Sequence, residues 1–119
     1  MPRTTLTESV APGPFPTAGV VVTADAADIA NQNRVTWTGR ALIIAHNTGA
    51  SGRTVTITSV ADRFGRTGTI SAEAIAAGVR RVYGPFTNPD GWRQSDGYLY
   101  LEANNAEVVF MVITLPATL

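Results

Sequence analysis

The stretch Arg40–Val60 constrains the fold more than any other part of the chain. Residues 41–45 are apolar at every position, which is typical of a β-strand covered on both faces. Between residues 54 and 58, threonine and aliphatic side chains alternate, as they do in a strand with one buried face. Residues 47–52 are small or tolerate unusual backbone angles, so they suit a chain reversal. The stretch predicts a β-hairpin whose first strand is central in a sheet.

A second hairpin is predicted around Asn104 and Asn105, two residues that suit a tight type I′ turn. Its strands would be residues 97–103 and 106–115, and positions 108–113 are again apolar throughout. In this pairing Glu102 lies opposite Glu107, and facing like charges are destabilising. Either both carboxylates project into water, or a cation or an arginine of a partner subunit lies between them.

Shorter strands are expected near residues 19–23, 34–38, 69–72 and 78–86, with one helical turn after Asp25. About eight short strands with frequent turn residues predict an all-β protein, an antiparallel β-sandwich of jelly-roll type. The prolines in residues 1–17 exclude a helix or a central strand there. We therefore expect an extended N-terminal arm over residues 1–18 and a single sandwich domain over residues 19–119.

The arm has two interpretations. It is a disordered tail, or it is ordered against a neighbouring subunit through the apolar side chains of Leu6, Val10 and Phe15. The second interpretation makes the arm the first candidate for partner contact.

Composition excludes several kinds of chemistry. Nine arginines balance nine acidic residues, so no global field attracts nucleic acid or an anionic membrane. No cysteine is present, which removes disulfides, thiolate nucleophiles and cysteine-bound metals. No apolar stretch approaches the roughly 20 residues of a membrane span, and no signal segment opens the chain. The only histidine, His46, has no recognisable triad partner. We expect no enzymatic activity and no cofactor, and we expect the protein to stay in the compartment where it is made unless it leaves inside an assembly.

The longest loop, residues 87–96, holds the strongest candidates for contact. Asn88, Asp90 and Asp96 suggest a calcium ligand set, but their spacing differs from an EF-hand, and such residues are ordinary turn formers. Trp92 beside Arg93 is typical of an interface anchor, although Trp92 could instead fold back as a lid on the core.

All nine basic residues are arginines, which suit bidentate contacts at interfaces. A GC-rich genome would give the same bias. If the arginines serve contacts, those expected at a partner surface are Arg3, Arg63, Arg66 and Arg93.

Several segments together resemble small proteins encoded in the structural gene modules of tailed bacteriophages and prophages. They are Ala45–Ser51, Thr54–Asp62, Phe64–Thr67, Tyr83–Phe86, Gly91–Gln94 and Leu99–Ala103. The resemblance spans most of residues 35–115. It implies a virion component, above all a capsid decoration (cement) protein of β-sandwich type that is made in the bacterial cytoplasm. The implied partners are the major capsid protein and further copies of the chain, for example in a trimer.

Two alternatives stay open. Within the same structural class, the chain could be a head–tail connector or a tail component. In a different class, it could be a carbohydrate- or receptor-binding sandwich in which Trp92, Tyr98 and Tyr100 form an aromatic platform.

Overall fold

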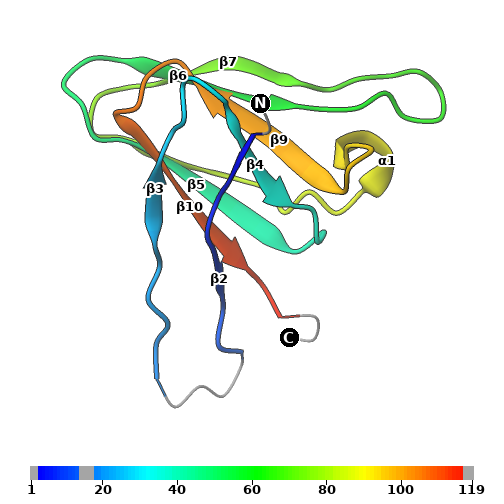
Figure 1. The fold of residues 1–119 in the computed structure, drawn as a ribbon, viewed down its shortest axis with the longest axis horizontal. Coiled ribbons are helices and arrows are strands. Elements are labelled where there is room, and N and C mark those ends of the chain that lie inside the picture. Colours follow the sequence, from blue (N-terminus) through cyan, green and yellow to red (C-terminus); the bar gives the residue numbers. More distant parts are fainter. Residues whose placement is uncertain (1–2, 14–17, 117–119) are drawn as a thin grey trace.

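Two five-stranded sheets pack face to face in the computed structural model, which describes residues 3–13 and 18–116 (Figure 1). In spatial order the first sheet contains β1 (Thr4–Thr5), β4 (Asn33–Thr36), β9 (Tyr98–Ala103), β6 (Arg53–Thr58) and β7 (Ile70–Ile75). The second contains β2 (Glu8–Val10), β10 (Val108–Thr114), β5 (Ala41–Asn47) and β8 (Arg80–Tyr83), and β3 (Ala24–Ala26) also pairs with β10. The helix α1 (Pro89–Trp92) is a single turn.

The predicted all-β sandwich is confirmed, but the described residues form ten strands rather than eight. The sheets are also mixed rather than purely antiparallel, because β1 pairs with β4 and β2 pairs with β10 in parallel. Both parallel pairs involve the N-terminal segment, in which the sequence predicted no strand.

The N-terminal segment crosses from one sheet to the other instead of leaving the sandwich as an arm. Leu6, between β1 and β2, is 3% exposed and belongs to the core. Prolines are absent between Arg3 and Ala11, so the backbone there can donate to both ladders. Leu6 is therefore used inside its own chain and is not available to anchor a neighbour. Phe15 lies outside the described residues.

The predicted hairpin over residues 40–60 is wrong. β5 is hydrogen-bonded to β10 and β8 in the second sheet, whereas β6 is bonded to β9 and β7 in the first. The turn between β5 and β6 thus carries the chain across the core. The predicted hairpin of β9 and β10 is wrong for the same reason, because these strands also lie in different sheets.

The core lies between the inner faces of the two sheets. Along β5 and β10 burial alternates: Ile43, Ala45, Phe110 and Val112 are fully buried. The intervening side chains of both strands are only partly buried. The expectation that these apolar runs are covered on both faces therefore fails for the outer face of the single chain.

The region before β4 differs in detail from the prediction. The strand forms at residues 24–26 rather than 19–23, and Asp28 rather than Asp25 organises the following turn. The Asp28 side chain accepts hydrogen bonds from the backbone N–H of Ala30 at 3.1 Å and of Asn31 at 3.0 Å. Asp25 instead accepts from the backbone of Thr7 at 2.7 Å, which ties β3 to the N-terminal segment.

Candidate functional site

Three of the residues predicted to contact partners gather where the β6–β7 loop meets the loop that carries α1. The Arg63 guanidinium donates to Asp90 at 2.9 Å, and the Val60 backbone N–H donates to the carbonyl of Gly91 at 2.8 Å. These bonds hold the two loops together around a cleft of about 220 Å³. Its lining includes Ser59, Asp62, Arg66, Asn88, Asp90 and Trp92.

The tip of the β6–β7 loop presents a fixed group of one aromatic and two cationic side chains. Phe64 is 73% exposed, and the side chains of Arg63 and Arg66 are each 72% exposed. Arg66 pairs with Asp62 at 2.8 Å, and its guanidinium lies 5.0 Å from the centre of the Phe64 ring. Hydrogen bonds from the backbone N–H groups of Arg66 and Phe64 lower the pKa of Asp62, against some desolvation, so the carboxylate that organises the tip stays charged.

Trp92 is a lid on the core and also one wall of the cleft. Its ring centroid lies 4.6 Å from that of Phe86 at an interplanar angle of 57°, and it packs against the core cluster. Arg93, at the end of α1, is exposed. Asn88 accepts from the backbone N–H of Asp90 at 3.0 Å and caps the turn, which is the ordinary turn role. Residues 3–13 and 18–116 contain no group of three or more His, Asp or Glu residues that could hold a metal ion.

Arg3 lies elsewhere and is engaged by its own chain. Its guanidinium lies 4.2 Å from the centre of the Tyr100 ring and donates to the carbonyl of Asn33 at 3.2 Å. Arg34 covers the Tyr98 ring in the same way at 3.9 Å. One face of each tyrosine is thus occupied by an arginine, and Trp92 packs on the core instead. The geometry does not favour the predicted aromatic sugar platform.

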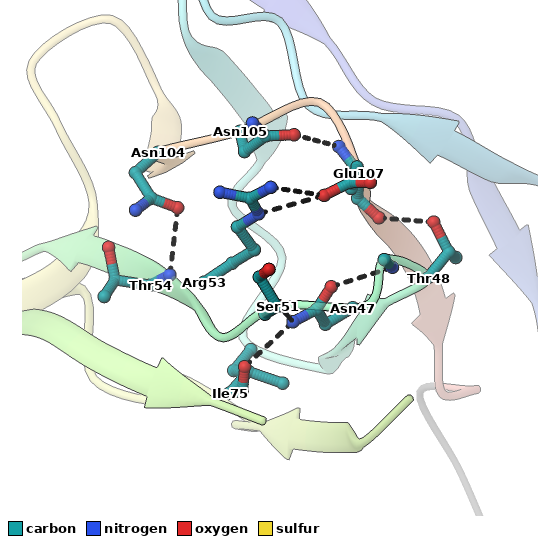
Figure 2. A network of polar contacts seen from close by, with 10 residues as sticks. Asn47, Thr48, Ser51, Arg53, Thr54, Ile75, Asn104, Asn105 and Glu107 are labelled. Carbon is teal, nitrogen blue, oxygen red and sulfur yellow. Dashed lines mark hydrogen bonds and ion pairs between the residues drawn. The ribbon is translucent and has the colours of Figure 1, made fainter. Parts of the chain in front are cut away.

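Glu102 and Glu107 do not face each other, because β9 and β10 belong to different sheets. Glu102 accepts from the side chain of Gln32 at 2.7 Å. Glu107 accepts two hydrogen bonds from Arg53, at 2.6 and 3.0 Å (Figure 2). An arginine does neutralise one carboxylate, but it comes from β6 of the same chain. The predicted pairing of Glu102 with Glu107 is wrong, and the alternative of a cation or a partner's arginine between them falls with it.

The same network fixes the two turns that cross the core (Figure 2). Asn47 is fully buried, and its amide donates to the carbonyls of Ser51 at 2.7 Å and Ile75 at 3.0 Å. Its side-chain oxygen accepts from the backbone N–H of Gly49 at 3.0 Å. The sequence identified Asn47 only as a turn residue, whereas its side chain joins β5, the turn and β7.

A second surface was missed by the sequence analysis: the outer face of the second sheet is aliphatic. Ile44 of β5 lies between Met111 of β10 and Val82 of β8, and Val82 is 61% exposed. We call this surface the apolar face. It consists of Leu42, Ile44, Val82, Val109, Met111 and Ile113. The unbroken apolar runs of β5 and β10 were the available signal.

Between β2 and β3 the chain leaves the sandwich as a projection that we call the finger, described at residues 11–13 and 18–23 (Figure 1). Val21 is 85% exposed, and Val20 and Val22 are 47% and 39% exposed. A groove of about 220 Å³ separates Val10, which is 57% exposed, from Val20 and Val22. Ile113 lines this groove and also belongs to the apolar face, so the two surfaces are continuous.

Within residues 3–13 and 18–116, no helix is long and apolar enough to cross a membrane. Comparison with protein-family models, with curated proteins and with solved structures found no match to this chain.

Proposed function

We propose that this chain is a non-enzymatic virion structural protein, a capsid decoration protein that binds the major capsid protein on the phage head. The observation that carries the proposal is the exposed tip Arg63–Phe64–Arg66 beside the Trp92 cleft. It adds to the resemblance of residues 35–115 to phage structural proteins.

The side chains at the tip are of the types that contact partners in protein interfaces. Arginine and aromatic side chains carry most of the binding energy in protein interfaces. Asp62 and Asp90 orient the two arginines in the free chain, and both guanidinium groups remain largely exposed to a partner.

The ion pairs of the tip contribute little to folding. Ion pairs as exposed as Arg63–Asp90 are screened by water and add little to the stability of the fold. Both arginines can therefore exchange an internal carboxylate for one on a capsid subunit at small cost to the fold. The overall charge is balanced, so such binding depends on local pairing rather than on a long-range field.

The test uses heads from a phage in which the gene for this chain is deleted. Purified protein is added, and binding is measured by co-sedimentation and by survival of the heads on heating. We expect binding and stabilisation by the native chain, and loss of both with Arg63→Glu combined with Arg66→Glu. Arg80→Glu, an exposed charge reversal on β8 of the other sheet, is the matched control and is expected to bind normally.

Absence of binding to heads, with heat resistance unchanged, would refute the decoration role. If labelled protein were found at the head–tail junction or along the tail, the connector or tail alternative would replace the decoration role.

A further inference from the structure

We propose that two copies of this chain associate about a two-fold axis by stacking their apolar faces, with the finger of each copy extending over β8 of the other. This self-association goes beyond the proposed function and does not require it. The partner is a second copy because the same chain carries both complementary surfaces.

Aliphatic side chains remain accessible on the outer face of the second sheet. The aliphatic side chains of three adjacent strands form one continuous surface, and the finger adds Val20, Val21 and Val22 at its margin. Large contiguous apolar patches on soluble proteins mark interaction sites. Packing a second sheet about 10 Å above the first would bury such a face as a sandwich core does.

Charge is nearly absent from both surfaces. The described parts of the finger, residues 11–13 and 18–23, contain no acidic, basic or histidine side chain. On the outer face of β5 and β8, the polar residues His46 and Arg80 are cross-strand neighbours at one end of the face. The rest of the face, from Leu42 to Ile44 and Val82, is uncharged, so two copies can stack there without burying an unpaired charge.

The edges of the second sheet are complementary. The finger leaves from the β2 and β3 edge, and β8 forms the opposite edge. We propose a two-fold axis that lies between the stacked faces and runs parallel to the strands, because only this orientation places each edge over the opposite edge of the partner. The finger of one copy then faces β8, which carries Val82, of the other copy.

The backbone also fits this contact. Within the described residues, the backbone of residues 18–23 makes no hydrogen bond to another backbone group. No described backbone group therefore occupies the donors and acceptors of residues 18–23, and the outer edge of β8 pairs with no strand of the described sheet, so the two can pair between copies.

A stable interface needs the area of both the apolar face and the finger. β5 and β10 are seven residues long, and four strand positions span the sheet, so the face measures roughly 23 by 19 Å, or about 440 Å². A standard interface buries about 800 Å² on each partner. The face alone supplies about half of this, and the finger is the adjoining apolar surface that supplies the remainder.

Sedimentation equilibrium of the purified full chain over a range of concentrations tests the association. We expect a monomer–dimer equilibrium whose dissociation constant rises about 30-fold or more in Val82→Arg and in Val21→Arg. Both sites are exposed in the single chain, so the folded monomer should persist, as circular dichroism would verify. Ile29→Arg, at a 49% exposed site in the turn after β3, is the matched control and should dimerise normally.

Cysteine cross-linking tests the arrangement, because the native chain has no cysteine. Val21→Cys mixed with Val82→Cys should form a disulfide-linked dimer under mild oxidation, and Ile44→Cys should cross-link with itself near the axis. Val21→Cys mixed with Ile29→Cys should not. A monomer at all concentrations, a trimer, or cross-links of Val21→Cys only with itself would overturn the proposal. Head binding by a protein that stays monomeric would leave the proposed function standing while refuting this inference.

Discussion

Replacement of Asn47 by alanine probes the interaction that holds the two crossing turns in place. Its side chain is fully buried and joins three backbone groups, the N–H of Gly49 and the carbonyls of Ser51 and Ile75. Alanine removes all three bonds without adding bulk. We therefore expect a large loss of stability from a residue that has no part in either candidate surface.

The size of the expected loss of stability depends on which backbone groups lose a hydrogen-bond partner. Ile75 is fully buried, so water cannot replace the hydrogen bond that its carbonyl loses, and this loss should cost about 1–3 kcal/mol. Ser51 is exposed and Gly49 is partly exposed, so water can replace those two bonds, at a net cost of about 0.5–1 kcal/mol each. The sum is a loss of about 2–5 kcal/mol, a large part of the roughly 5–15 kcal/mol that stabilises a typical domain.

The free energy of unfolding is measured by urea denaturation followed by tryptophan fluorescence, with the m-value checked for constancy. Asn104→Ala is the matched control, because Asn104 also bonds a backbone group, the N–H of Thr54 at 3.0 Å, but is exposed. We expect that control to lose less than about 1 kcal/mol. Equal and small losses in the two variants would show that burial of the Asn47 network does not control stability as argued.

Three further predictions concern the fold. Leu6→Ala should lower the free energy of unfolding by about 2–5 kcal/mol in the same assay, whereas Val10→Ala, at an exposed site, should change it by less than about 0.5 kcal/mol. Hydrogen bonds from the Thr4 hydroxyl and the Asn31 backbone lower the pKa of Asp28. The contribution of Asp28 to stability is therefore present above its unfolded pKa near 4, and it is lost as the pH falls through its folded pKa. Asp28→Asn should weaken this acid dependence in thermal melts. Burial and a bond to Glu73 raise the pKa of Tyr83, so stability should fall as pH rises above about 10, where the unfolded tyrosine ionises and the folded one does not. Tyr83→Phe should reduce this fall, measured by urea denaturation at a series of pH values.

The sequence predicts the strands better than their pairing. Alternation at residues 54–58 and the apolar runs at 41–45 and 108–113 correctly indicate strands of a sandwich. These patterns tell which side chains face the core, but they do not tell which strand lies alongside. A reversal rich in glycine and asparagine serves equally for a hairpin within one sheet and for a crossing between two sheets. The partners of β5 and β6 therefore needed the structure.

The candidate site was predictable by residue type but not by position. Arginine and tryptophan on loops indicated contact, and Arg66 and Trp92 do line one cleft, with Arg63 bound to its Asp90. Arg3 shares their chemistry but packs on Tyr100, because β1 pairs with β4 and the Arg3 side chain reaches β9, the next strand of the sheet. Local composition cannot distinguish these cases, since the difference arises from contacts distant in sequence.

The two outer faces of the sandwich differ in composition, and this difference supports a partner for the aliphatic face. On the first sheet, the outward positions of β6 are threonines, and the tyrosines of β9 lie under arginines. On the second sheet, the outward positions of β5 and β10 are mostly aliphatic. Folding of the single chain requires only the inner rows to be apolar, as β6 demonstrates. The aliphatic outer row adds nothing to that core. It also leaves apolar surface in contact with water, at a free-energy cost of about 25 cal/mol per Å². A second copy that covers this face recovers that free energy. Self-association therefore explains why the outer row is aliphatic, which the fold of one chain does not explain.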